Sequence, residues 1–204
     1  MNFDVFNRWY VLITFSLSAM TQMMTWFTFS SIPAASMGYY GFSESELALV
    51  LNWGTIVYVA FAFLIVSFLS QAPPKRLRAA IRFGSFLILL GNIIRTIPTF
   101  FLNPPDNSSS SSSSEHYVSI GWRACVHVGQ FINSIAGITA LSPVSLLSQT
   151  YFPSNQYALA TTIAYTSASL GMASLFFLGP AIASSSALIP RFLRILSTVS
   201  LVSF

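Results

Sequence analysis

The chain has 204 residues, of which 54% are hydrophobic and 7% are charged. A soluble domain carries about 25% charged residues, because its surface must contact water. This scarcity of charge sets aside soluble enzyme folds and indicates a polytopic membrane protein. The net charge of +4 does not indicate nucleic-acid binding, because four of the nine basic residues lie in one short segment between apolar stretches. These four are Lys75, Arg76, Arg78 and Arg82.

The sequence predicts an all-α transmembrane bundle over residues 1–183. A helix needs about 20 apolar residues to cross the hydrocarbon core of a bilayer. Five stretches satisfy this requirement, and they cover residues 9–32, 47–70, 79–102, 120–147 and 158–183. Ser43, followed three residues later by Glu46, predicts a capping box at the start of the second span.

Two segments outside these spans need a separate description. Residues 103–117 contain an unbroken serine run and predict a flexible loop. Residues 184–204 are interrupted by Pro190 and two arginines, so they form either an atypical tail or a partial sixth helix.

The distribution of basic residues predicts the orientation. Short loops rich in Lys and Arg stay on the cytoplasmic side, which places the loop at 71–82 and the N-terminus in the cytoplasm. The serine-rich loop then lies on the lumenal or extracellular side. Asn107 begins an Asn-Ser-Ser acceptor pattern in that loop and is a candidate for N-glycosylation.

The fourth span carries a stripe of polar residues. Spacings of three and four residues place these side chains on one helical face: Arg123, His127, Gln130 and Asn133. Such a stripe either lines an aqueous path for a substrate or forms polar contacts between helices. His127 is a candidate for proton coupling, or else a neutral hydrogen-bonded residue.

The first and third spans carry weaker polar faces. Gln22 and Trp26 lie one helical turn apart, and Trp26 is deeper than a tryptophan of the interfacial belt. Its ring either contacts a ligand or packs in the core. In the third span Arg95 shares a face with Asn92, where it snorkels, pairs or lines the path.

Catalytic motifs are missing from the sequence. All five acidic residues lie at chain ends or in predicted loops, so no span holds a carboxylate pair. The chain contains no HExxH pattern, glycine-rich phosphate loop or GxSxG elbow. Cys125 is the only cysteine, which excludes an intramolecular disulfide and a multi-cysteine metal site. We therefore expect no enzyme activity, no metal and no cofactor.

Several short motifs occur in a characteristic order along the chain. They include Tyr40-Gly41-Phe42-Ser43, Asn52-Trp53-Gly54, Arg95-Thr96-Ile97-Pro98, Gly129-Gln130 and Pro143-Val144-Ser145. With these motifs, residues 8–183 resemble the N-terminal half of a major facilitator superfamily transporter of solute carrier family 49. This family includes the feline leukaemia virus subgroup C receptor-related proteins and the disrupted-in-renal-carcinoma protein.

The resemblance implies two six-helix bundles that transport a small organic solute by alternating access. It implies choline-like amines as solutes in one branch and lysosomal export of the vitamin pyridoxine in the other, hence a plasma or lysosomal membrane. Trp26 matches the first-span tryptophan implied in substrate binding, and Gln130 matches the Gly-Gln pair of the fourth span.

Five spans are fewer than the twelve helices that the resemblance implies. One hypothesis is a truncated transporter whose partners are the bilayer, a small solute and a C-terminal six-helix bundle. The alternative is a short, non-transporting form that associates with a full-length transporter and modulates it.

Overall fold

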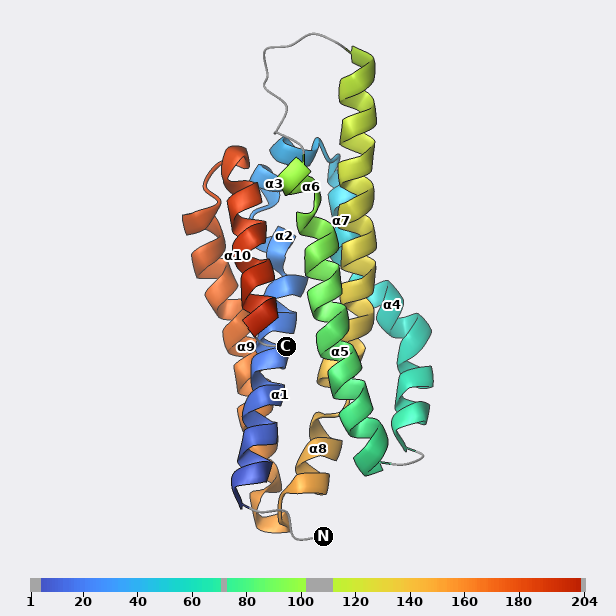
Figure 1. Ribbon diagram of the computed structural model, residues 1–204, viewed down its shortest axis with the longest axis vertical. Coiled ribbons are helices and arrows are strands. Elements are labelled where there is room, and N and C mark those ends of the chain that lie inside the picture. Colours follow the sequence, from blue (N-terminus) through green and yellow to red (C-terminus); the bar gives the residue numbers. More distant parts are fainter. Residues whose placement is uncertain (1–4, 71–72, 102–111, 203–204) are drawn as a thin grey trace.

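The computed structural model describes residues 5–70, 73–101 and 112–202. Over these ranges the chain forms helices and no strands, and the long helices stand side by side in an elongated bundle (Figure 1). The predicted all-α bundle is therefore confirmed. Four helical stretches are long and apolar enough to cross a bilayer, as expected of a multi-pass membrane protein. They are Glu44–Ile65, Lys75–Thr96, Gly121–Tyr151 and Ser154–Ile182.

The described helices differ greatly in length. The long ones are α1 (Val5–Trp26), α4 (Glu44–Ser70), α5 (Pro73–Thr96), α7 (Ser112–Leu141) and α9 (Tyr157–Ile182). The shorter ones are α2 (Thr28–Ser31), α3 (Pro33–Tyr40), α6 (Pro98–Phe101), α8 (Val144–Tyr151) and α10 (Ile189–Val202). Two 3-10 turns flank α9, at Ser154–Gln156 and Ser186–Leu188.

Proline residues explain several helix ends. Pro73 is the first residue of α5, so this helix starts before the predicted span at 79–102. Proline suits a first helical position because its missing N–H would have no partner there. Pro98 disfavours helical geometry at Ile97, and α5 accordingly ends at Thr96. In contrast, α7 already begins at Ser112, inside the segment predicted as a loop.

Small residues bring α1 and α9 together. Ala160, Ala164 and Ala168 of α9 are buried in one cluster with Leu12 and other apolar residues of α1. One helical turn beyond this row, a β-carbon added to Gly171 would clash with the backbone carbonyl of Met20. Close approach of this kind is typical of helices that pack inside a membrane.

The end of the described chain is an amphipathic helix that packs on the bundle. α10 buries Phe192, Leu193 and Leu196, and Ser197 Oγ lies 2.6 Å from Thr96 Oγ1 of α5. Its 14 residues extend over about 21 Å, which is shorter than the hydrocarbon core of about 30 Å. The sequence left two alternatives for residues 184–204, an atypical tail or a partial sixth helix. In the structure residues 189–202 of this segment form a packed helix.

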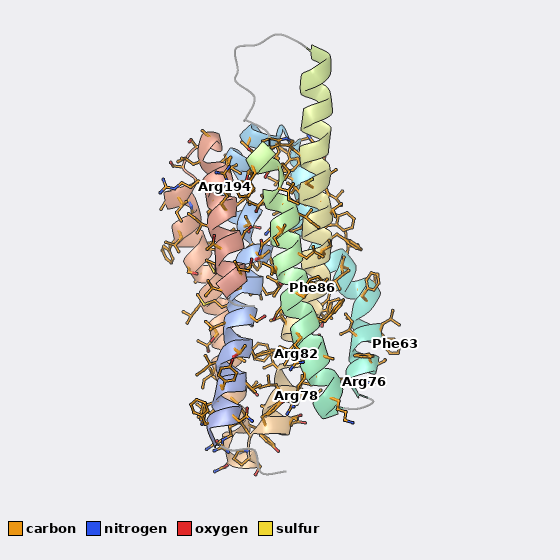
Figure 2. The ribbon with its side chains drawn as sticks, in the orientation of Figure 1. Phe63, Arg76, Arg78, Arg82, Phe86 and Arg194 are labelled. Atoms are coloured by element: carbon orange, nitrogen blue, oxygen red, sulfur yellow. The ribbon has the colours of Figure 1, made fainter. Side chains whose placement is uncertain are left out.

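Basic side chains gather at one end of the bundle. Figure 2 shows Arg76, Arg78 and Arg82 near the end at which α1 begins, whereas Arg194 lies toward the opposite end. Phe63 projects outward from α4 and is 79% exposed, as expected for a side chain that faces lipid.

Candidate functional site

The predicted first span is interrupted where α1 ends at Trp26 and α2 begins at Thr28. Carbonyl groups at a helix end lack intrahelical partners and need other donors. Here two other helices supply them: Arg95 Nη1 of α5 donates to Thr25 O at 3.3 Å, and Gln130 Nε2 of α7 donates to Trp26 O at 3.2 Å. The backbone at the end of α1 is therefore hydrogen-bonded to side chains of α5 and α7.

Arg95 lies at the centre of this polar region and is 1% exposed. Its Nη1 also donates to Gln130 Oε1 at 3.0 Å, and its Nη2 donates to Asn92 Oδ1. The guanidinium lies over the ring of Phe29, 5.5 Å from the centroid. In the described part of the chain no carboxylate forms a salt bridge with it. The sequence left three roles open for Arg95: snorkelling, pairing or lining a path. In the structure Arg95 pairs with the amide oxygens of Gln130 and Asn92.

Gln22 and Asn133 are completely buried where α1 meets α7. Gln22 Nε2 donates to the backbone carbonyl of Asn133 at 2.9 Å. The other amide atom of Gln22 and both amide atoms of Asn133 have no hydrogen-bond partner among the described residues. A buried polar group without a partner costs free energy, so these three atoms set the contact of α1 with α7 apart from ordinary helix packing.

The indole of Trp26 lies between α4 and α7, in a slot made by two glycines. A β-carbon added to Gly54 would clash with Trp26 Cζ2, and one added to Gly137 would lie 3.0 Å from Trp26 Cζ3. Phe27 stacks on the same indole with ring centroids 6.2 Å apart. Trp26 as a whole residue is only partly buried, and its ring packs against these neighbours. We name Gln22, Trp26, Asn92, Arg95, Gln130 and Asn133 the polar core.

Arg123 does not join the polar core. It holds the turn between α3 and α4: Nε donates to Tyr40 O at 3.0 Å, and Nη2 donates to Gly41 O at 2.6 Å. Its Nη1 forms a salt bridge with Glu46 Oε2 at 3.3 Å. Ser43 Oγ accepts the backbone N–H of Glu46 at 3.2 Å, as the capping box predicts. The sequence offered only this local role for Glu46, because its contact with Arg123 joins distant segments.

His127 connects α7 to α4 beside this salt bridge. Its Nδ1 accepts a hydrogen bond from Trp53 Nε1 at 3.0 Å, and its Nε2 lies 3.8 Å from Glu46 Oε1. An indole nitrogen only donates, so Nδ1 is unprotonated in this arrangement. From the sequence, Trp53 was named only as part of the Asn52-Trp53-Gly54 motif, and its bond to the distant His127 was missed. The predicted stripe thus divides into the polar core and a separate cluster of Glu46, Trp53, Arg123 and His127.

Two buried phenols lie next to the segment that Arg123 holds. Burial raises the pKa of Tyr39, and Arg194 opposes this shift. Burial also raises the pKa of Tyr40, with a further contribution from Tyr39. Both phenols therefore stay neutral at ordinary pH and add no negative charge near the polar core.

The remaining features concern metal ligands, the single cysteine and the glycosylation candidate. The described residues contain no group of three or more His, Cys, Asp or Glu side chains that could hold a metal ion. Cys125 is a free thiol. Asn107, the glycosylation candidate, lies outside the described residues.

Comparison with known proteins supports the family resemblance. No protein-family model matches the chain. Over 174 residues, or 85% of its length, the chain is 30% identical to the solute carrier family 49 member 4 homolog of Xenopus tropicalis. Over the same length it is 29% identical to the homolog of Xenopus laevis. The chain is therefore related to solute carrier family 49, as its motifs predicted.

The similarity covers only part of these relatives. The aligned region is 34% of each homolog, so the chain spans about a third of the length of the curated relatives it matches. The relatives are solute carriers by name.

Proposed function

We propose that the chain contributes a binding site for a small organic solute to a membrane transporter. The observation that carries this proposal is the pair of buried amides in the polar core. Among the described residues, Gln22 and Asn133 leave three polar atoms without partners, and both Gln22 and the partly buried Trp26 lie next to Gly137. Ligand sites are commonly apolar and aromatic, with a few convergent polar groups that orient the ligand.

The surroundings of these amides suit a small vitamin-like or amine-like molecule. An amide group both donates and accepts hydrogen bonds, so Asn133 can bind hydroxyl groups or ring nitrogens. The face of Trp26 attracts an apolar ring or a cationic group. Pyridoxine and choline represent these two kinds of solute and are suitable probes.

Direct binding tests this proposal. Tritiated pyridoxine and choline would be added separately to the purified chain in lipid nanodiscs. Replacing Asn133 by Leu removes both amide atoms that lack partners. For the probe that binds, we expect about tenfold weaker binding, because a factor of ten corresponds to the loss of about one or two hydrogen bonds. Thr139→Val is the matched control, because Thr139 is buried on the same helix and its hydroxyl donates within that helix, to Ala136 O.

Two results would count against the proposal. One is the absence of binding of both probes to the unaltered chain. The other is equal affinity of the unaltered chain and its folded Asn133→Leu variant.

We propose further that this chain needs a second bundle in order to transport. Alternating access moves one bundle against another around a site between them. The chain aligns with about a third of its relatives, and we expect no solute flux from proteoliposomes that contain the chain alone. Robust flux under these conditions would refute this part. Co-purification with a full-length relative would instead favour the alternative of a modulating short form.

His127 is our proposed residue for proton coupling. It is the one histidine with described contacts inside a candidate span, and it bonds a second helix through Trp53. Histidine commonly changes charge between about pH 5 and pH 8. Protonation of Nδ1 would remove the acceptor for Trp53 Nε1, and the added positive charge would attract Glu46, whose Oε1 lies 3.8 Å from Nε2. In a transport-competent assembly, His127→Gln should therefore remove the pH dependence of uptake while uptake itself persists.

The membrane and the orientation are also proposals. We propose a plasma or lysosomal membrane, with the N-terminus and the segment after α4 on the cytoplasmic side. The clustering of Arg76, Arg78 and Arg82 near the start of α1 supports this orientation (Figure 2). Glycosylation at Asn107 would place the serine-rich segment on the opposite side. A glycosidase-sensitive mass shift that Asn107→Gln abolishes is the expected result.

A further inference from the structure

Arg95 occupies space that two glycines create between α5 and α7. A β-carbon added to Gly91 would lie 2.8 Å from the carbonyl of Gly129, and one added to Gly129 would clash with the Arg95 side chain. The helices therefore approach closely at this level, and the stem of Arg95 lies directly against α7. Its guanidinium reaches α1 from there.

The guanidinium determines how the amide of Gln130 is turned. A guanidinium has only donors, so Gln130 must face it with Oε1, at 3.0 Å from Nη1. The NH2 group of the same amide then faces the carbonyl of Trp26, at 3.2 Å. A Gln130 amide turned the other way would face Arg95 with its own donors and leave the Trp26 carbonyl without one.

Arg95 also bonds the interrupted helix directly. Its Nη1 lies 3.3 Å from Thr25 O, one residue before Trp26. Arg95 thus acts on two consecutive carbonyls at the end of α1, one directly and one through Gln130. A lysine would keep the positive charge but has no planar fork with donors in several fixed directions.

We infer that Arg95 is a positioning residue: together with Gln130 it holds the end of α1 and thereby fixes the indole of Trp26 in its glycine slot. The inference rests on the proposed function in one respect, because the orientation of Trp26 matters for transport only if Trp26 contacts the solute. The structural part, that Arg95 controls the environment of Trp26, can be tested without any solute.

The experiment uses the full chain in nanodiscs with Trp9, Trp53 and Trp122 replaced by Phe, so that Trp26 is the only tryptophan. Acrylamide quenching of its fluorescence measures how accessible the indole is. We expect Arg95→Gln to raise the quenching constant about twofold, because Thr25 O keeps only the Thr28 hydroxyl as a described donor and the Gln130 amide that bonds Trp26 O loses the group that orients it. Arg194→Gln is the control, since Arg194 bonds Thr99 beyond α5 and has no described bond to α1.

A double-mutant cycle shows whether Arg95 acts through Gln130. Arg95→Gln, Gln130→Leu and the double variant should raise the quenching constant by similar amounts, because residues in one hydrogen-bond network are not additive. Arg95→Lys covers the case in which Arg95→Gln does not fold, and it should also raise the quenching constant. Unchanged quenching in a folded Arg95 variant, or fully additive effects, would overturn the inference.

The same variants separate this inference from the proposed function. If Arg95→Gln exposes Trp26 but Trp26→Phe binds pyridoxine and choline as the unaltered chain does, the positioning of Trp26 stands and its contact with the solute fails. If Trp26→Phe weakens binding while Arg95 variants leave quenching unchanged, the proposed site stands and the positioning role fails.

Discussion

Several polar side chains in this bundle donate hydrogen bonds to backbone carbonyls of other helices. Gln22 donates to Asn133 O, Gln130 donates to Trp26 O, and Arg123 donates to Tyr40 O. In a membrane, irregular backbone needs such partners because no lipid group can replace them. These bonds explain how α1 and the α3–α4 turn depart from helical geometry inside the protein.

The slot around Trp26 gives a prediction for Gly54. An added β-carbon would clash with the indole, so Gly54→Ala must displace Trp26. We expect a loss of about 1–3 kcal/mol in unfolding free energy, as is typical of overpacking, with a shift in tryptophan emission. Gly121→Ala is the control, because a β-carbon added to Gly121 contacts nothing within 4 Å. Equal stability of the two variants would contradict the slot.

The salt bridge of Glu46 gives a second prediction. Glu46→Gln weakens the bonds to Arg123 and His127, and both partners remain partly exposed. We expect a modest loss of about 0.5–1 kcal/mol, measured by thermal unfolding in detergent. Glu44→Gln is matched, since Glu44 is an exposed acid in the same first helical turn. A larger effect of the control would show that the helix dipole, rather than the salt bridge, is responsible.

α1 has different kinds of contact with different helices. It packs on α9 through small residues, contacts α7 and α5 through the polar core, and ends at Trp26 within the bundle. Hydropathy predicted one span at 9–32, and the structure divides this range into α1 and α2, which are separate at Phe27. The side chains that bond the break come from residues 95 and 130, so a local pattern contains no signal for it.

Other elements were easier to predict. The second to fifth spans overlap α4, α5, α7 and α9, because long apolar runs dominate the local signal. The stripe on α7 correctly placed Gln130 and Asn133 on an inner face, and both are buried. It also placed Arg123 and His127 with them, although helices pack different partners at different heights. Periodicity shows which residues share a helical face, but only the tertiary structure shows that they contact different partners.

The seam between α1 and α9 allows a prediction at the level of helices. Gly171→Ala would bring a β-carbon against the backbone carbonyl of Met20, so the two helices must separate. Backbone cannot move aside as a flexible side chain does, and we expect a loss of about 1–3 kcal/mol in unfolding free energy, measured by thermal unfolding in detergent. The open position at Gly121 again provides the control, through Gly121→Ala. Unchanged stability of Gly171→Ala would contradict the close packing.

The whole molecule combines an apolar exterior with a small polar interior. Phe63, Val59 and Phe177 are about 80% exposed, which suits lipid rather than water. Inside, the polar core joins α1, α5 and α7, and Arg95 is its buried charge. This arrangement is the basis for our central claim that a solute binds within the bundle, near Asn133.

The most direct test of this claim is protection of Asn133 by a solute. Asn133→Cys in a Cys125→Ser background places the only thiol at the proposed site, because Cys125 is the only native cysteine. Its alkylation rate by a small maleimide would be measured in nanodiscs, without and with saturating pyridoxine or choline. We predict that one of the two probes slows alkylation severalfold. Alkylation at the same rate with both probes, or no alkylation at all, would contradict a solute site at Asn133.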